Sequence, residues 1–301
     1  MTNKKPSQEI THYVDASMYE AEPPLEDRVP RVTLLSATPD PLGALSAACA
    51  MYEGRVIRNL NELTDDDRKH YWEQVQKTHL KAPLEFIDLH FMVENVSRAF
   101  THQMVRQRTA VYAQESLRFA VKEQIDARPG PLIAEHPDAL EIWSDTMQSL
   151  WGTYHELIQL GMPAEEARGI LPHDTMTRLN FKTNLRNLAD HLGNRLCTQA
   201  QFEWRMVATA MRSAIMEYKG PYLGHPNDAS STLPGRDPHT NWQFRHIAES
   251  NLFQPVCFTM GHCPFNASFD RGCTIRQRVD AGRFDEIRTS EWLADPKAAF
   301  Q

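Results

Sequence analysis

The chain has 301 residues, a formal net charge of -7, and apolar and charged fractions of 41% and 24%, as in an ordinary globular protein with a substantial core. The negative charge argues against a nucleic-acid coat, although it permits a local basic pocket for a small anion. No apolar run approaches the roughly 20 residues that span a bilayer, the N-terminus lacks the apolar segment of a secretory signal, and five unevenly placed cysteines suit a reducing compartment. We therefore expect a cytoplasmic enzyme or binding protein that contacts neither a membrane nor a nucleic-acid polymer.

The first elements follow a polar arm. Residues 1–31 are polar and contain several prolines, which predicts an N-terminal extension. Residues 32–37, VTLLSA, predict a strand, and residues 41–54 have the small-residue density of a closely packed helix. Thr64 is followed by three aspartates, a pattern typical of a helix N-terminus because the hydroxyl caps free amides and the carboxylates face the positive end of the dipole.

A second strand and a helix lead into an unusual basic segment. After Pro83, the run LEFIDLHFMVE alternates apolar and polar residues, which predicts a strand with one buried face. Asn95 is the expected cap of the next helix, in which Val96, Phe100 and Met104 recur every four residues and predict a core-facing stripe.

The basic segment is QMVRQRTAVYAQESLRF, from Gln103 to Phe119. It contains Arg106, Arg108 and Arg118 but little acid. Arginine binds phosphate with a rigid fork and presents a flat face to a ring, which lysine cannot do. The pattern therefore indicates either a site for a planar anion or a basic surface turn, placed where a helix ends in a loop.

The second half begins with a long predicted helix that starts at Pro137 and ends at Gly161. Its apolar stripe, which we expect in the core, comprises Trp143, Met147, Leu150, Trp151, Tyr154, Leu157 and Ile158. A short helix at 163–171 is expected next, and residues 174–184, DTMTRLNFKTN, predict a strand.

Two further helices are expected after this strand. Residues 185–196 predict the first, and Thr198 with Gln201 is interpreted as a capping box for the second, which extends to about Lys219. A second polar group is distributed over this region: Arg168, Asn184, Arg186, Asp190, Asn194, Arg195, Gln199 and Gln201. Together with the upstream arginines, it suggests that both halves of the chain converge on one anionic site.

The last part of the chain, 221–301, is interpreted as a linker and a cysteine-bearing extension. Zinc sites take Cys and His ligands, but their tight pairs are two to four residues apart, and the spacing here is wider. We therefore predict reduced structural thiols and no metal site. The alternative is a metal site, and its candidate ligands are Cys257, His262, Cys263 and Cys273.

RQRTAVYAQESLRF resembles the signature of flavin-dependent thymidylate synthases, R-H-R, two residues, S, one residue, N, two residues, S, one residue, R. The later run ARGILPHDTMTRLNFKTNLRNLADHLGNRLCTQAQFEWR resembles the second block of the same family. The resemblance extends over about residues 32–219. It implies a catalytic domain at 32–220, flanked by the arm and by the extension.

For the fold and activity, the resemblance implies an α+β protein with a central mixed sheet, long flanking helices, and a homotetramer with shared active sites. It implies C5 methylation of dUMP to dTMP, with FAD as cofactor and methylenetetrahydrofolate and NADPH as co-substrates.

For the site, the resemblance implies that Arg195 lies at the pyrimidine and is catalytic, because a fixed cation stabilises negative charge on the ring. The implied substrate-binding residues are Gln103, Gln114, Ser116, Arg118, Arg168 and Arg195. The implied cofactor-binding residues are Arg106, Gln107, Arg108, Asn184, Arg186 and Asp190. Gln103 and Arg118 are expected nearest the phosphate, and Ser116 is expected to hold substrate rather than to act as a nucleophile.

The chain also departs from the family pattern, mainly on the flavin side. The altered positions are Phe86, Gln107, Val111, Ala113, Gln114, Asp190 and Gln199. Two alternatives to methylation therefore stay open: hydroxymethylation of the pyrimidine nucleotide, in which water traps an exocyclic methylene, and a catalytically silent nucleotide-binding relative.

Overall fold

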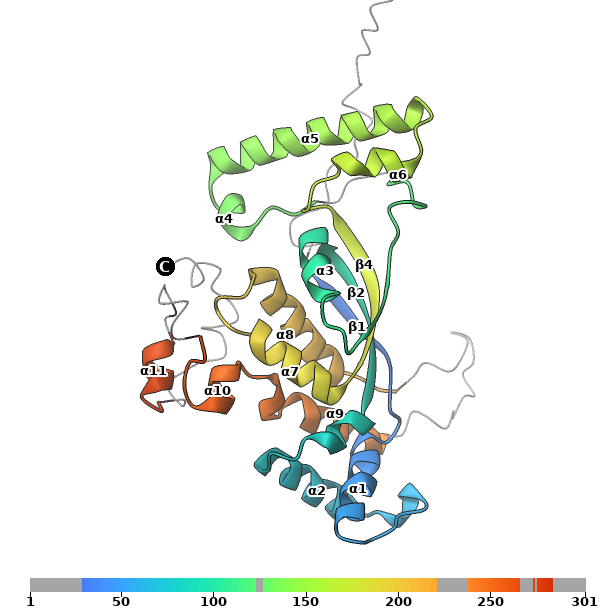
Figure 1. Cartoon of the computed structure of the whole chain (residues 1–301), viewed down its shortest axis with the longest axis vertical. Helices are drawn as coiled ribbons and strands as arrows, with labels where there is room; N and C mark the ends of the chain where they lie inside the picture. Colours follow the sequence, from blue (N-terminus) through green and yellow to red (C-terminus); the bar gives the residue numbers. More distant parts are fainter. Residues whose placement is uncertain (1–28, 123–126, 221–237, 266–272, 274, 284–301) are drawn as a thin grey trace, which may run out of the picture.

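A small antiparallel sheet lies at the centre of the computed structural model, which describes residues 29–122, 127–220, 238–265, 273 and 275–283 (Figure 1). Its strands are β1 (Arg31–Ala37), β2 (Asp88–Ser97), β3 (Val111–Gln114) and β4 (Met176–Asn184), in the order β1-β2-β4-β3. Every pairing within this sheet is antiparallel, so the expectation of a mixed sheet is wrong. The reason is visible at β1 and β2, where Ala37 pairs with Leu89: the helices between them bring the chain back to the same end of the sheet.

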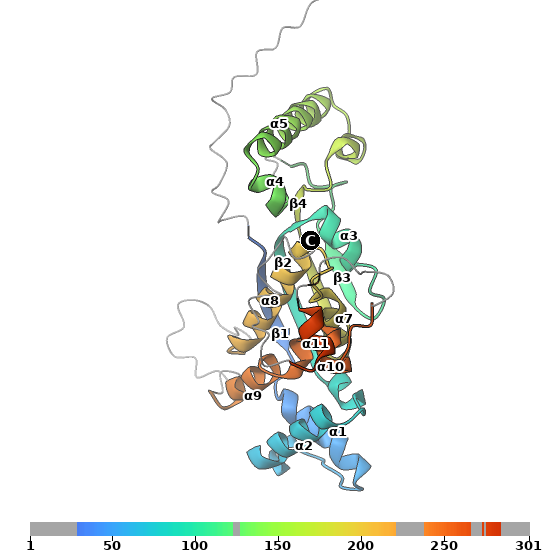
Figure 2. The same cartoon turned by 90° about the vertical axis from the view of Figure 1, so that its left-hand side faces the viewer.

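The buried face of the sheet follows the predicted alternation. Ile87, Leu89, Phe91 and Val93 are fully buried, whereas Asp88 is exposed. Helices α7 (Leu185–Arg195) and α8 (Phe202–Met216) lie against the sheet in both views (Figures 1 and 2). The core therefore lies between one sheet face and this helix pair, as expected for an α+β layer structure.

Strand β2 continues three residues beyond the predicted end. Asn95 has a φ of 56° at the irregularity between Val93 and Val96, so it does not cap a helix. Ser97 caps α3 (Arg98–Met104) instead, and its Oγ accepts a hydrogen bond from the Phe100 amide at 3.0 Å. The buried Glu203 of α8 accepts hydrogen bonds from the Ser97 amide and hydroxyl at 2.7 and 2.6 Å. The start of α3 is thus fixed by a contact that is distant in sequence.

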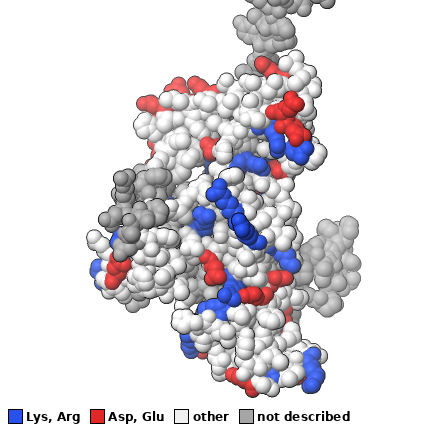
Figure 3. Space-filling view, in the orientation of Figure 1, with Lys and Arg blue, Asp and Glu red and all other residues white. Residues whose placement is uncertain are grey.

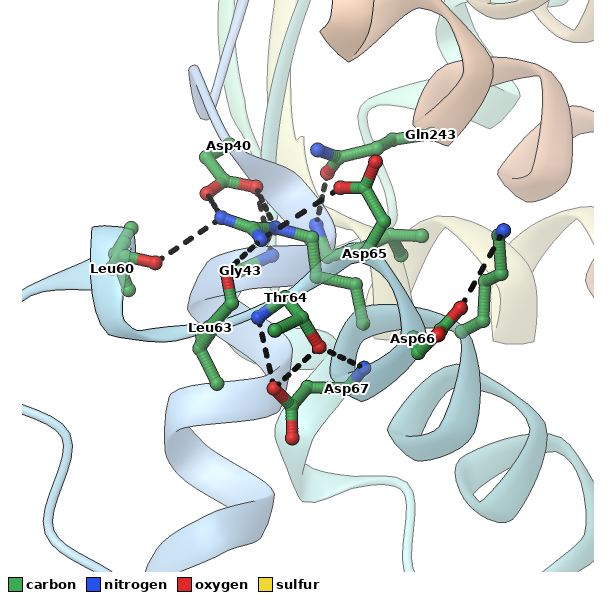
Figure 4. A network of polar contacts seen from close by, with 12 residues as sticks. Asp40, Gly43, Leu60, Leu63, Thr64, Asp65, Asp66, Asp67 and Gln243 are labelled. Atoms are coloured by element: carbon green, nitrogen blue, oxygen red, sulfur yellow. Dashed lines mark hydrogen bonds and ion pairs between the residues drawn. The ribbon is translucent and has the colours of Figure 1, made fainter.

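Helices α1 (Pro41–Tyr52) and α2 (Asp65–Lys77) form one end of the molecule, with Thr64 as the predicted cap of α2. Arg68 connects them (Figure 4): its guanidinium donates to both oxygens of Asp40, at 3.1 and 2.6 Å, and to the Leu63 carbonyl at 2.7 Å. Short 3-10 helices, η3 (Leu60–Glu62) and η4 (Ala82–Phe86), flank this pair.

The opposite end carries α4 (Pro131–Ala134), the long α5 (Pro137–Gln159), α6 (Ala164–Ala167) and η5 (Arg168–Ile170) (Figure 1). Among the side chains of the predicted α5 stripe, all of which are described, Tyr154 is fully buried and the others are half-buried. Trp143 donates its indole N–H to Asp174 at 3.0 Å.

The C-terminal elements are α9 (Pro238–Ala248), η6 (Asn251–Phe253), α10 (Val256–Met260) and α11 (Arg276–Asp280). Phe244, Ile247, Phe253 and Ile275 belong to the same core cluster as the sheet residues, and the Gln243 side chain accepts a hydrogen bond from the Leu42 amide at 2.8 Å. The arm 1–28 and most of the predicted linker, 221–237, lie outside the described residues. Among the described helices, none is both long and apolar enough to cross a bilayer.

Candidate functional site

Gln103 lies at the centre of a polar cluster that joins α3, α7 and α8. Its amide nitrogen donates to the Gln201 carbonyl oxygen at 2.5 Å. Its own carbonyl oxygen accepts from the Trp204 indole at 3.2 Å and from Arg195 Nη1 at 3.5 Å. Both ends of the Gln103 amide are therefore used, which fixes the side chains around the last turn of α3.

Arg195 is held on an aromatic surface beside a second cation. Its guanidinium carbon lies 5.0 Å from the centroid of the Trp204 ring, within the range of a cation–π contact. Burial and, next, the charge of Arg106 lower the pKa of Arg195. Two neighbouring cations on a partly buried surface are suited to an anionic group or to a carbonyl oxygen that gains negative charge.

His191 is a site residue that the sequence interpretation missed. Its ring centroid lies 4.8 Å from that of Trp204 in an edge-on arrangement. Burial and, to a smaller extent, the charge of Arg195 lower the pKa of His191 to about 4. Within the described part of the chain, its buried Nε2 has no hydrogen-bond partner. Its position four residues before Arg195 on α7 was the available signal, because such residues share a helix face.

Gln107 stands at the position of the signature histidine. Its amide nitrogen donates to the Asn187 carbonyl at 2.9 Å, and its buried carbonyl oxygen has no hydrogen-bond partner among the described residues. Arg106 and Arg108, on either side, are exposed. A neutral amide in this place orients the turn after α3 and cannot accept a proton as imidazole can.

The other predicted cofactor residues lie at the start of α7 and along it. Asn184 caps the helix by accepting from the Asn187 amide at 2.9 Å. Arg186 donates to Glu85 at 2.5 Å and lies 4.0 Å from Asp190. The Asp190 side chain is 75% exposed, so it is accessible to a ligand as well as to Arg186.

A second basic group surrounds Glu165. Arg118 forms an ion pair with the Glu165 carboxylate at 2.9 Å, and Arg168 Nε donates to the Glu165 backbone carbonyl at 3.2 Å. Burial and, next, the charge of Arg168 lower the pKa of Arg98, which the sequence interpretation did not single out. Ser116 Oγ accepts from the Arg118 amide at 3.3 Å. Three arginines thus occupy one region, with one carboxylate between two of them.

The first basic group, Arg195 with Arg106, and the second, Arg118 with Arg98 and Arg168, lie at opposite ends of α3. The seven residues of this helix span about 10 Å at 1.5 Å per residue. Gln103, which was expected beside Arg118, lies at the Arg195 end of the helix instead. Gln114 donates to Thr101 of α3 at 2.9 Å. Figure 3 shows basic side chains in a stripe over α3 and the turn that follows it, with a further basic group beside carboxylates near α6. The arrangement offers two cationic contact points to one elongated anion.

The cysteines of the C-terminal region line a separate pocket. Its lining includes the predicted candidates Cys257, Cys263 and Cys273. It also includes Cys197, which follows α7 and was not a predicted candidate. His262 is exposed, and its Nδ1 is 3.0 Å from the Met260 carbonyl oxygen, so it is not part of this group. Among the described residues, no group of three or more His, Cys, Asp or Glu side chains is arranged so that it could hold a metal ion.

An α+β fold with cationic groups at both ends of one short helix is the kind of arrangement that suits a small anion. The fold resembles the crystal structure of a UMP/dUMP methylase, PolB from Streptomyces cacaoi, bound with 5-Br dUMP. That match has a TM-score of 0.52 and 21% sequence identity, and it covers 62% of this chain and 89% of the other.

The family model described as thymidylate synthase complementing protein matches residues 33–218. The chain belongs to this family of thymidylate synthase-like enzymes. Flavin-dependent thymidylate synthase from Pyrococcus abyssi is 28% identical over 254 residues, 82% of this chain and 95% of the relative. The enzyme of the same name from Geobacter sulfurreducens is 32% identical over 186 residues, 60% of this chain and 80% of the relative.

Proposed function

We propose that this protein is a flavin-dependent enzyme that methylates C5 of dUMP to form dTMP, with methylenetetrahydrofolate as the one-carbon donor and NADPH as the reductant. The observation that carries the proposal is the placement of the Arg195 cluster and the Arg118–Arg168 group at opposite ends of α3. Their separation along a helix of about 10 Å suits a nucleoside monophosphate, with the base at one end and the phosphate at the other.

At the base end, Arg195 is the catalytic residue. The Trp204 ring and the Gln103 carbonyl hold its guanidinium in place. A preorganised cation beside the pyrimidine carbonyl stabilises the negative charge that develops as C5 becomes nucleophilic, without reorientation during the reaction. Gln103 keeps this cation in position, and its contact with Gln201 couples α3 to the start of α8.

At the phosphate end, Arg118 and Arg168 supply the cations and Ser116 supplies a hydroxyl. Arginine forks bind phosphate oxygens in pairs. The hydroxyl of Ser116 accepts a hydrogen bond from the Arg118 backbone amide and, within the described part of the chain, donates none to a side-chain base, which supports substrate holding and not nucleophilic attack. Arg98, next to Arg168, adds to the positive potential of this end.

The residues at the turn after α3 fit an FAD molecule. Arg106 and Arg108 are exposed cations that suit its diphosphate, and the buried carbonyl oxygen of Gln107 is an acceptor without a partner among the described residues. Asn184, Arg186 and Asp190 at the start of α7 would complete the cofactor surface. The bound flavin would supply hydride, and the chain's own residues orient the nucleotide and exclude water.

The active assembly is proposed to be a homotetramer in which neighbouring protomers share each site, located in the cytoplasm. The proposed catalytic domain spans residues 32–220, close to the family match at residues 33–218.

The second candidate function is hydroxymethylation of the same nucleotide. The observation that favours it is the Gln107 amide at the position of the signature histidine, with its nitrogen bonded to a backbone carbonyl. This change alters the flavin side of the site while the nucleotide residues are kept. The two reactions differ in whether hydride or water reaches the exocyclic methylene at C5.

The test is an incubation of the purified protein with dUMP, methylenetetrahydrofolate, NADPH and FAD, followed by mass analysis of the nucleotide. We expect dTMP. A product heavier than dTMP by one oxygen would establish hydroxymethylation, and recovery of unmodified dUMP while bound FAD is reduced would refute both reactions and leave a nucleotide-binding relative.

A further inference from the structure

Four of the five cysteines converge on one pocket that the proposed reaction does not use. Cys197 follows α7, Cys257 lies in α10, Cys263 lies in the loop after α10, and Cys273 lies shortly before α11. The remaining lining is largely apolar and includes Pro255, Val256, Pro264, Phe265, Ile275 and Val279. The fifth cysteine, Cys49, is buried in α1.

Close packing brings the C-terminal segment to α7. A Cβ atom placed on Gly193 would lie 3.8 Å from the Gln254 carbonyl oxygen and 3.9 Å from Val256. Figures 1 and 2 both show α10 beside α7. A side chain at position 193 would be in ordinary van der Waals contact with this segment, so α10 packs directly against α7, which brings Cys257 toward Cys197.

The four thiols line one pocket whose other walls are largely apolar. All four are free thiols. Four mutually repelling thiolates in an apolar pocket become favourable when a cationic centre binds them, because coordination deprotonates the thiol.

The arrangement of the donors argues against a single ion. Four sulfurs bound to one zinc at about 2.3 Å lie within about 4 Å of each other, and among the described residues no three His, Cys, Asp or Glu side chains are grouped so that they could hold a metal ion. The spacing also lacks the tight pair typical of zinc, because five residues separate Cys257 from Cys263 and nine separate Cys263 from Cys273. An iron–sulfur cluster takes the same four thiolates at wider separation, since each binds a different iron.

We propose that Cys197, Cys257, Cys263 and Cys273 bind a [4Fe–4S] cluster. The four thiolates, formed by loss of one proton each, complete the coordination of the four irons. The cluster holds α10 and α11 against the chain segment between Arg195 and Gln201, and it thereby helps to position these two residues of the proposed base site.

The test begins with the full-length protein, purified without oxygen and without added metal. Iron, zinc and acid-labile sulfide are measured per chain, and the dithionite-reduced protein is examined by electron paramagnetic resonance, because flavin absorption obscures the optical spectrum. We expect about four iron and about four sulfide per chain. One zinc per chain without sulfide, or no metal after anaerobic reconstitution with ferrous iron and sulfide, would overturn the proposal.

Single Cys→Ser variants test the ligands. C197S, C257S, C263S and C273S should each lose most of the iron and sulfide, whereas C49S, a buried cysteine outside the pocket, should keep both. Circular dichroism on each variant separates loss of the cluster from loss of the fold. If C197S retained the wild-type iron and sulfide content, the assignment of Cys197 as a ligand would be wrong.

Discussion

The Arg195 guanidinium lies 5.0 Å from the centroid of the Trp204 ring, and the Trp204 indole donates to the Gln103 carbonyl that also accepts from Arg195. These three side chains come from α7, α8 and α3. Trp204 itself is fully buried, so the cation rests on a part of the core. In the proposed reaction, a fixed cation of this kind would act at the transition state more than on the bound substrate.

Replacing Arg195 with lysine should therefore reduce turnover more than binding. Lysine keeps the charge but loses the planar fork and the stacking on Trp204. We expect kcat to fall by about 100-fold, the range found when one directed donor is lost, with a smaller change in the Kd for dUMP. Steady-state kinetics and calorimetric titration with dUMP measure the two quantities, and equal losses in both would show that Arg195 only anchors the substrate.

Arg118→Ala should weaken dUMP binding by about 10- to 100-fold, because a charge-assisted phosphate contact is lost. The matched control is Glu165→Gln, which removes the carboxylate that pairs with Arg118 at 2.9 Å and leaves the arginine in place. The control should bind dUMP at least as tightly as the wild-type protein. An unchanged Kd in Arg118→Ala would show that the phosphate lies elsewhere.

Arg68→Met should destabilise the protein by about 3–5 kcal/mol, because it leaves Asp40 partly buried without its partner. Burial alone would raise the pKa of Asp40, but hydrogen bonds from Arg68 and Gln243 and the charge of Arg68 lower it. Urea unfolding measures the free energy of unfolding. The double variant Asp40→Asn/Arg68→Met should recover part of the loss, since an asparagine side chain at position 40 can still accept the hydrogen bond from the Gly43 amide that caps α1. A loss below about 1 kcal/mol in Arg68→Met would instead show that the pair behaves as a surface ion pair.

His191 should make the protein less stable in acid. Its pKa is about 4 when folded, below the ordinary value of 6.5, so the unfolded chain binds the proton first as the pH falls. The stabilisation is complete above pH 6.5 and is lost as the pH falls to 4, with a magnitude on the order of 2 kcal/mol.

The variant His191→Phe keeps an aromatic ring against Trp204 but cannot titrate. Thermal unfolding between pH 7 and pH 4 should show a flatter dependence of Tm on pH for this variant than for the wild type. Parallel curves for the two proteins would contradict the role of His191.

Local patterns predicted the elements that have strong periodicity. The alternation around Phe91 and the aspartates after Thr64 identified β2 and the start of α2, although β2 begins four residues and ends three residues later than predicted. Strand β3 was missed because it has four residues and is set by pairing with β4, where Tyr112 lies opposite Phe181. The cap of α3 was misplaced because Glu203, distant in sequence, selects Ser97.

The same limit applies to the site. Arginine types and spacing identified Arg195 and Arg118 as candidates, but the sequence carried no distance between them. Thr198 and Gln201 were interpreted as a capping box, and this is wrong: Thr198 is buried and Gln201 instead accepts a hydrogen bond from Gln103. Cys197 was overlooked because Cys257, Cys263 and Cys273 lie 60 to 76 residues further along the chain, and only the packing of α10 against α7 brings them together.

The ion pair between Arg118 and Glu165 has a consequence for ligand exchange. If Arg118 binds the nucleotide phosphate as proposed, the phosphate replaces a carboxylate of the same chain and not bulk water, so its arrival releases Glu165 to solvent. A dianion competes for this arginine better than a monoanion, and discrimination between a nucleotide and its nucleoside is thereby built into the unliganded protein. In the proposed site, the Glu165 carboxylate therefore competes with the ligand for Arg118, and a ligand at this end of α3 needs enough negative charge to displace it.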